Sequence, residues 1–336
     1  MKVRPSEQGA ALLAVLLLVA VMASLSAVAL EKMTLASRTA GNAAALEQER
    51  AFALGAERYA LLRVGDLTRM SPDRTTLAGG WHGVPIRIPL PGGAASATVV
   101  DGGNCFNLNS VVRNADAYAN SGVRDGAPPV YIADSRGMQQ LAGLLGVVGV
   151  PTNQSAQIAA SLADWIDTDT TPLPGGAEDS AYAGLPAPYR TPNSLVVDPS
   201  ELREVTGMTA EAYAAVKPWL CALPEAKVSP INVNTLSIEQ APLIAMLLPG
   251  QLGLEDARNL IARRPANGWE TGAFWKEPLV KSLNVAPAVM AQIVEKTRWF
   301  HLRLDVDLTG VQMQEDALID AGSKPARLVS RNWGQD

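Results

Sequence analysis

The sequence predicts an α+β protein with a long N-terminal transmembrane helix and an antiparallel sheet that is interrupted by a large α-helical insertion of two subdomains. Three observations lead to this fold class. An apolar N-terminal segment runs on into helix-favouring residues, strand-like segments lie near both ends of the remaining chain, and its middle is mainly helical. With 336 residues, 48% of them hydrophobic, the chain can bury a sizeable core.

The N-terminal segment has the length of a membrane span. Residues 10–30 carry no charge, and a helix of this length covers about 31 Å, the thickness of one bilayer core. Lys2 and Arg4 precede the segment, which places its start in the cytoplasm. No helix breaker follows it, and apolar residues recur at helical spacing at Phe52, Ala56, Tyr59 and Leu62. We therefore predict one continuous helix over residues 10–70.

Strand-like segments lie on both sides of the helical middle. Residues 83–109 contain two apolar, β-branched runs bounded by Pro-Gly and Gly-Gly turns, and the runs RWFHLRLDVDLTG and PARLVSRNWG follow residue 297. Between them the pattern is helical, with Asp198 as the expected cap of a helix that has Pro199 at its first position and Glu201 at its third. The sheet is thus expected to form from distant parts of the chain.

The helical insertion contains an internal duplication. FNLNS at residues 106–110 is echoed by INVNT at residues 231–235, and a Leu-rich helix, a glycine-containing turn and a second helix follow each. Two packed helical subdomains are therefore expected. Asn109 and Asn234 are expected to stabilise the turns that lead into these helices.

Composition and motifs argue against nucleic-acid binding and catalysis. The net charge is -5, which gives no overall attraction to polyphosphate. The stretch LLPGQLGLEDARNLIARR resembles a helix-hairpin-helix unit, but Gly250 and Gly253 are separated by two residues where the DNA-binding pattern has one. His82 and His301 belong to no HExxH motif, and no GxSxG sequence is present. We expect no catalytic residues, no enzyme activity and no nucleic-acid partner.

The two cysteines, Cys105 and Cys221, lie far apart and outside any CxxC motif. Metal-thiolate and thioredoxin-like chemistry are therefore excluded. In an oxidising compartment the two residues are expected to form a disulfide between the strand-rich part of the chain and the insertion.

An acidic loop, DWIDTDTTPLPGGAED at residues 164–179, holds five carboxylates. It can be interpreted as a catalytic carboxylate pair, a site for a hard cation or a solvated loop without an ion. Repulsion among five carboxylates favours a cation. Calcium accepts six to eight oxygens in flexible geometry and is therefore expected rather than magnesium, and zinc is disfavoured because no Cys or His is nearby. The predicted metal ligands are Asp164, Asp167, Asp169, Glu178 and Asp179.

The N-terminus resembles the type IV pilins and the pseudopilins of type II secretion. A short basic leader ends at Gly9, and Ala10 opens an apolar helix that continues beyond the membrane. The resemblance implies that prepilin peptidase cuts between Gly9 and Ala10 and that Ala10 is N-methylated. Ala14 stands where most of this class has Glu, and the minor pseudopilin component K family (general secretion pathway protein K) lacks that Glu. The run D-W-x-D-x-D followed by G-A-E-D and Tyr182 also resembles the calcium-associated loop of component K.

The resemblance implies a structural subunit at the tip of the type II secretion pseudopilus, with structural calcium. Its implied partners are the minor pseudopilins I and J, other type II secretion components, prepilin peptidase and secreted substrates. It is expected to be a single-pass inner-membrane protein with most of the chain in the periplasm. The alternative is a secreted calcium-dependent enzyme or binding protein, released by ordinary signal-peptide cleavage after Ala29, which ends an A-x-A sequence.

These expectations divide the chain into five parts. They are a prepilin leader (1–9), a transmembrane and amphipathic pilin helix (10–70), the first part of a pilin-like β domain (71–109), an α-helical insertion that carries the acidic loop (110–287) and the closing strands of the β domain (288–336).

Overall fold

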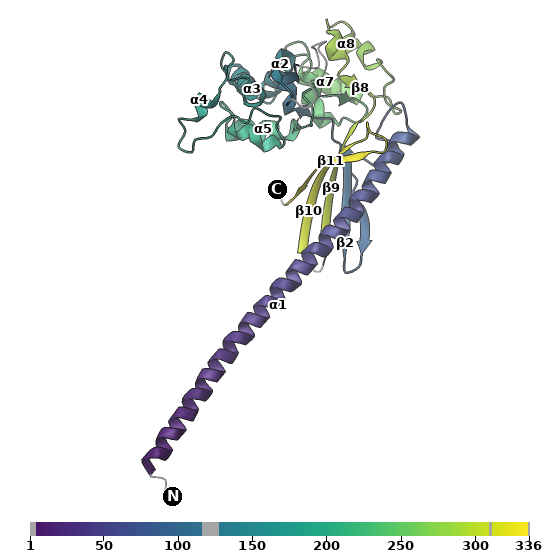
Figure 1. Ribbon diagram of the computed structural model, residues 1–336. Helices are drawn as coiled ribbons and strands as arrows, with labels where there is room; N and C mark the ends of the chain where they lie inside the picture. Colours follow the sequence, from purple (N-terminus) through teal and green to yellow (C-terminus); the bar gives the residue numbers. More distant parts are fainter. Residues whose placement is uncertain (1–4, 116–127, 309–310, 335–336) are drawn as a thin grey trace.

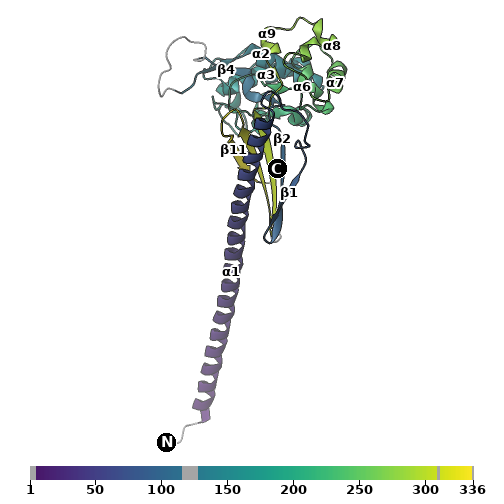
Figure 2. The ribbon, with the colours of Figure 1, turned by 90° about the vertical axis from the view of Figure 1, so that its right-hand side faces the viewer.

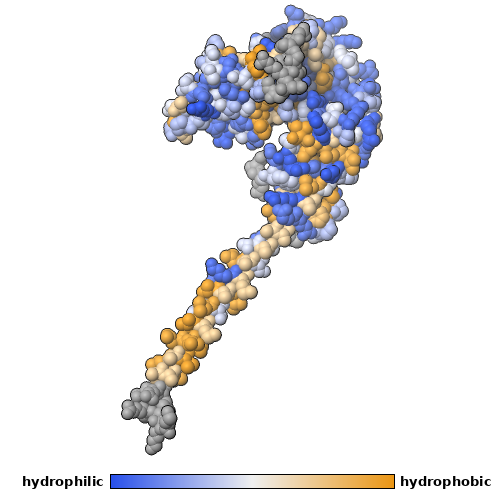
Figure 3. Space-filling model, in the orientation of Figure 1, coloured by the Kyte–Doolittle hydropathy of each residue, from blue (hydrophilic) through white to orange (hydrophobic). Residues whose placement is uncertain are grey.

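Helix α1 (Pro5–Met70) is the longest element of the protein and confirms the prediction of one helix over residues 10–70. The computed structural model describes residues 5–115, 128–308 and 311–334, so residues 1–4 of the predicted leader lie outside it. At 1.5 Å per residue α1 is about 99 Å long. It contains a stretch that is long and apolar enough to cross a membrane, and apolar surface dominates its N-terminal half (Figure 3).

A five-stranded antiparallel sheet packs against the C-terminal part of α1 (Figure 1). Its spatial order is β1 (Ile86–Leu90), β2 (Gly93–Asp101), β9 (Trp299–Leu308), β10 (Val311–Asp320) and β11 (Arg327–Trp333). Alternate residues of β9, among them Phe300, Leu302 and Leu304, are buried against α1. The α1 side of this contact includes Ala56 and Ala60, whose small side chains let the helix approach the sheet closely.

The first half of the insertion carries the acidic loop. Its elements are β3 (Phe106–Asn107), η1 (Leu108–Val111), β4 (Val112–Asn114), β5 (Tyr131–Ala133), α2 (Ser135–Val147), α3 (Thr152–Ile166), α4 (Asp179–Tyr182), η2 (Pro199–Glu204), α5 (Ala210–Val216), η3 (Lys217–Trp219) and β6 (Leu220–Cys221). β3, which opens this half, pairs in parallel with β6, which closes it.

The second half repeats this plan in a shorter form. Its elements are β7 (Ile231–Asn232), η4 (Ile238–Gln240), α6 (Ala241–Ala245), α7 (Leu254–Ala262), η5 (Phe274–Lys276), α8 (Pro278–Lys281), α9 (Pro287–Met290) and β8 (Ile293–Val294). Its first strand, β7, again pairs in parallel with its last, β8. The equivalent pairing of the two halves supports the internal duplication inferred from FNLNS and INVNT.

The asparagines of the two repeated motifs make equivalent hydrogen bonds. The side chain of Asn109 accepts a hydrogen bond from the backbone N–H of Val196 at 2.8 Å and donates one to its carbonyl at 2.9 Å. Asn234 does the same with Trp269, at 2.6 and 3.0 Å. These buried side chains therefore hold a distant loop in place in each half. The local turn contacts expected of them are made instead by Asn107 and Asn232, whose side chains accept the backbone N–H groups of Asn109 and Asn234 at 3.2 and 2.9 Å.

The two halves share one hydrophobic core. Helices α2 and α3 contribute Leu141, Leu144, Ile158 and Leu162, and the second half contributes Leu243, Ile244 and Leu260. The buried amides of Gln140 and Gln292 exchange two hydrogen bonds across the boundary between the halves, at 2.7 and 3.1 Å. The insertion is thus a single packed body that lies at the membrane-distal end of the sheet (Figures 1 and 2).

Several elements differ from the sequence prediction. Asp198 and Glu201 form the expected capping box, but the helix that they start is a short 3₁₀ helix. The helix expected over residues 286–297 ends at Met290, because β8 follows and pairs with β7. Strand β10 was not predicted.

The insertion is longer than expected. The first part of the sheet ends with β2 at Asp101, and the sheet continues with β9 at Trp299, so the insertion extends beyond the predicted residues 110–287 at both ends.

Candidate cation site in the insertion

The acidic loop leaves the C-terminal end of α3 and returns at α4, at the outer end of the insertion (Figure 1). It brings together three of the five predicted ligands, Asp167, Asp169 and Glu178. Each offers one carboxylate oxygen, and these oxygens all lie within 4.8 Å of one another. Asp167 is buried, with 3% of its surface exposed, and so is Glu178 with 4%, whereas Asp169 is exposed.

Two carboxylate oxygens of this group are buried and have no hydrogen-bond partner among the described residues. They are Oδ1 of Asp167 and Oε1 of Glu178. Buried polar atoms are almost always paired, so such atoms need an explanation. A cation held between Asp167, Asp169 and Glu178 would supply the missing partner.

The other two predicted ligands lie outside this group of three. Asp164 is fully buried, and its two oxygens accept the backbone N–H of Leu173 at 3.1 Å. Asp179 accepts hydrogen bonds from the backbone N–H of Thr191 at 2.9 Å and from its hydroxyl at 3.0 Å. Asp164 therefore shapes the loop, and Asp179 fixes the segment that returns after α4.

Burial and mutual repulsion perturb the carboxylates. Burial, reinforced by the charges of Asp169, Asp164 and Glu178, raises the pKa of Asp167 to about 7. Burial also raises the pKa of Glu178, with the charge of Asp164 adding to the effect. Without a cation the folded loop binds protons more tightly than the unfolded chain, so this part of the protein loses stability as pH rises through the range from about 4 to about 7.

Gly176 allows the loop to close over Asp164. A Cβ atom at this position would lie 2.0 Å from Oδ2 of Asp164, far inside contact distance. Glycine is needed here because of this close approach. The sequence shows that two glycines are adjacent here, but it does not show that Asp164 packs against Gly176.

An aromatic cluster anchors the loop to the core. Trp165 packs edge-on against Tyr182, with ring centroids 5.5 Å apart, and Tyr189 stacks on Tyr182 at 5.1 Å. Tyr182 is 1% exposed, and its hydroxyl accepts a hydrogen bond from the backbone N–H of Thr206 at 3.2 Å. Trp165 and Ile166 are buried core residues, and Tyr182 is a packing residue.

The predicted disulfide between Cys105 and Cys221 is present, with the Cα atoms 5.7 Å apart. Cys105 directly precedes β3 and Cys221 lies in β6, the strand that pairs with β3. Both cysteines therefore belong to the first half of the insertion. The disulfide closes this half on itself rather than joining the sheet to the insertion, which corrects the expectation from the sequence.

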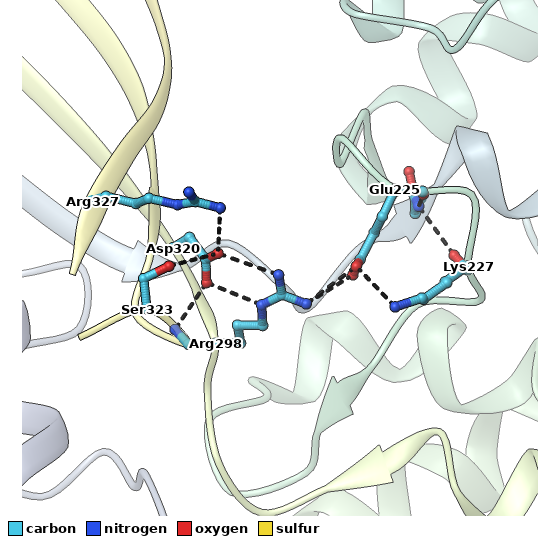
Figure 4. Close-up of polar contacts among 8 residues, drawn as sticks. Glu225, Lys227, Arg298, Asp320, Ser323 and Arg327 are labelled. Atoms are coloured by element: carbon cyan, nitrogen blue, oxygen red, sulfur yellow. Dashed lines mark hydrogen bonds and ion pairs between the residues drawn. The ribbon is translucent and has the colours of Figure 1, made fainter. Parts of the chain in front are cut away.

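A charged network joins the sheet to the junction between the two halves (Figure 4). Arg298 donates two hydrogen bonds to Asp320 at the end of β10, at 3.0 and 3.2 Å, and a third to Glu225 at 3.1 Å. Its guanidinium also lies over the ring of Trp299 at 4.4 Å. These contacts fix the insertion relative to the sheet.

The long apolar N-terminal helix, the sheet packed on its C-terminal part and the duplicated insertion with an acidic loop give the chain the architecture of an anchored, pilin-like subunit. Two family profiles described as "Type II secretion system (T2SS), protein K" match residues 104–225 and 231–296, which correspond to the two halves of the insertion. The chain belongs to the type II secretion system protein K family, and its role in the secretion system is that of a minor pseudopilin.

Curated relatives match over almost the whole chain. The type II secretion system protein K of Pectobacterium carotovorum subsp. carotovorum is 31% identical and that of Klebsiella pneumoniae is 32% identical, each over 98% of this chain and at least 97% of its own length. A crystal structure of the GspK-GspI-GspJ complex from enterotoxigenic Escherichia coli contains a chain that is 28% identical, with a TM-score of 0.70 over 86% of this chain and 97% of that one.

Proposed function

We propose that this protein is a non-enzymatic structural subunit at the tip of the type II secretion pseudopilus, bound to the minor pseudopilins I and J. The observation that carries the proposal is the similarity to a chain of the GspK-GspI-GspJ complex over 97% of that chain. Because the fold is shared over this length, homologues of I and J are the partners that we infer for this chain.

The shape of the molecule supports a position at the tip. The insertion lies beyond the end of the sheet that is remote from the membrane anchor, and it extends to the side of α1 (Figures 1 and 2). A subunit stacked above would meet this body. Ala14 lacks the carboxylate that pilin-class helices generally carry at this position, so the chain is suited to a place with no subunit above it.

For its targeting we propose a pilin-like route. Prepilin peptidase cuts between Gly9 and Ala10, Ala10 is N-methylated, and α1 then crosses the inner membrane once, with the sheet and the insertion in the periplasm. There the tip contacts other secretion components and secreted substrates. Mass spectrometry of the mature N-terminus tests this route: a methylated Ala10 supports it, whereas a mature chain that starts at Leu30 supports the secreted alternative.

We further propose that calcium is a structural cofactor of the acidic loop. Asp167, Asp169 and Glu178 support this proposal, because each offers a carboxylate oxygen and these oxygens lie within 4.8 Å of one another. In addition, Asp167 and Glu178 are buried, and each has one oxygen that lacks a hydrogen-bond partner among the described residues. Calcium accepts six to eight oxygens in flexible geometry, so Asp164, Asp179, backbone carbonyls and water can complete the site.

Assembly is tested by co-expressing the full-length chain with its own I and J and purifying the complex in detergent. The proposal predicts that the three proteins elute together. Two controls make the test specific: omission of J or I in turn, and replacement of this chain by a major pseudopilin. Separate elution of this chain under all conditions would contradict the proposal.

A further inference from the structure

Three charged side chains meet between α1 and the last two strands of the sheet. Glu57 of α1 is 5% exposed and Glu315 of β10 is 1% exposed. Arg331 of β11 lies between them: its Nε donates to Oε2 of Glu57 at 2.7 Å and to Oε1 of Glu315 at 3.2 Å. A second nitrogen of Arg331, Nη2, also donates to Glu57.

The surroundings of this cluster are mainly apolar. Leu304 of β9 is the register partner of Glu315 and is fully buried. On α1, Ala53 and Ala56 lie in the same buried stripe as Glu57. Glu49, also buried, lies in this stripe about 12 Å nearer the membrane, at 1.5 Å of rise per residue.

The cluster has one more acidic group than basic groups. With both carboxyl groups ionised, Glu57, Glu315 and Arg331 together carry one negative charge in a buried position, which is costly. Oε2 of Glu315 is buried and accepts no hydrogen bond from the described residues, although the carboxyl group of Glu57 is close enough to interact with Glu315 directly. A proton on Glu315 makes the cluster neutral. The protonated carboxyl group of Glu315 can then donate a hydrogen bond to the carboxylate of Glu57.

We propose that Glu57, Glu315 and Arg331 form a proton-dependent clasp between α1 and strand β11, closed when the two carboxyl groups hold one proton and weakened when this proton passes to solvent. Burial, together with the neighbouring carboxyl group of Glu57 and its negative charge, raises the pKa of Glu315 to about 8. Because the closed state binds the proton more tightly than the open state, the clasp loses strength as pH rises through this range and is weakest above pH 8.

The clasp controls the attachment of the sheet's edge. β11 is the last strand in the sheet order, with β10 as its neighbour, and Arg331 links it to α1. Opening the clasp therefore loosens β11 while the central strands stay packed on α1. The C-terminal edge of the sheet is thus more firmly attached at acidic pH than at alkaline pH.

Hydrogen–deuterium exchange of peptides that cover residues 327–333 tests the clasp. The full-length protein is labelled in detergent micelles with saturating calcium at about pH 6.5, 7.5 and 8.5, with labelling times scaled to the intrinsic exchange rate at each pH. We expect the opening equilibrium of β11 to rise with pH, by up to about tenfold per pH unit. Peptides from the central strand β9 serve as the internal reference and should not follow this trend.

Two variants separate the clasp from a merely structural role. Glu315→Gln and Glu57→Gln each remove the surplus charge, so β11 exchange should become independent of pH in either variant. Asp305→Asn, on the exposed side of β9, is the matched control and should keep the wild-type trend. If exchange of β11 in the wild-type protein does not change with pH after correction, the proposal is wrong. It is equally wrong if a folded Gln variant keeps the wild-type pH dependence.

Discussion

Replacing Asp167 by Asn separates a calcium site from a solvated acidic loop. Asp167 lies at the centre of the proposed site, buried and facing the charges of Asp169, Asp164 and Glu178. In the wild type, a cation that binds only the folded loop adds about 2.7 kcal/mol to the free energy of unfolding at a hundredfold excess over its Kd. For a folded part of this size that corresponds to a rise in Tm of roughly 5 to 10 °C.

The Asp167→Asn variant should lose most of the stabilisation by calcium, while its free energy of unfolding in the absence of calcium should not fall. The raised pKa of Asp167 means that ionising it costs stability as pH rises toward 7, and Asn removes this cost. In the presence of a chelator at pH 8 we therefore expect Asp167→Asn to be at least as stable as the wild type. In calcium its Tm should rise by less than half of the wild-type increase. Calcium affinity of the wild type should fall as pH drops below 7, because protons compete for the same oxygens.

The assay is thermal unfolding of the full-length protein in detergent micelles, with calcium, magnesium or chelator, after metal analysis of the starting protein. Asp73→Asn, at an exposed position after α1, is the charge-matched control and should respond to calcium like the wild type. The reasoning is refuted if metal-free wild-type protein melts at the same temperature in calcium and in chelator. It is also refuted if Asp167→Asn keeps the full calcium response.

Three further predictions concern the disulfide, the membrane helix and the packing of the insertion. Replacing Cys105 and Cys221 by Ser opens a loop with a sequence separation of 116 residues. The free energy of unfolding, measured by denaturant titration, should therefore fall by about 4 to 5 kcal/mol, and a fall below ~1 kcal/mol contradicts this. Ala14→Glu should disturb assembly with I and J while the periplasmic part stays folded, since an unpaired carboxylate in the bilayer costs about 2.5 to 3.5 kcal/mol; unchanged co-purification and secretion would argue against the role of this position. Gly137→Ala should destabilise by about 1 to 3 kcal/mol, because its Cβ would lie 1.7 Å from a backbone carbonyl oxygen of η1. Gly146→Ala on the same helix, with nothing within 4 Å, should be neutral or stabilising, and equal losses in these two variants would contradict the packing argument.

Features encoded by local sequence were predictable. The uncharged start and uninterrupted helix formers of α1 predict one helix over residues 10–70, and the structure contains it. The Asp198 capping box depends on residues three positions apart, and it forms as predicted. The pairing of Cys105 with Cys221 needed no contact information, because these are the two cysteines of the chain.

Features that depend on distant contacts were missed or changed. Strand β10 escaped prediction because Gln312, Gln314 and Asp316 lie on the sheet face opposite α1, and a charged residue, Glu315, takes a buried position on the α1 face. Strands are predicted from alternating apolar and polar residues, and a buried glutamate such as Glu315 breaks that pattern.

The acidic loop shows the same limit. Five carboxylates in sixteen residues indicate a cation site, but the folded loop decides which of them converge. Asp164 and Asp179 are engaged by the backbone of Leu173 and by Thr191, and three carboxylates remain to face one another. No sequence pattern linked Thr191 to the loop.

Native mass spectrometry of the full-length chain purified with its own I and J tests the central claim most directly. If this protein occupies the tip of the pseudopilus, the complex contains one copy of each of the three proteins, and added copies of this chain do not extend it. A complex that grows by stacking of this chain on itself, or one that forms from I and J with this chain left out, would contradict the account.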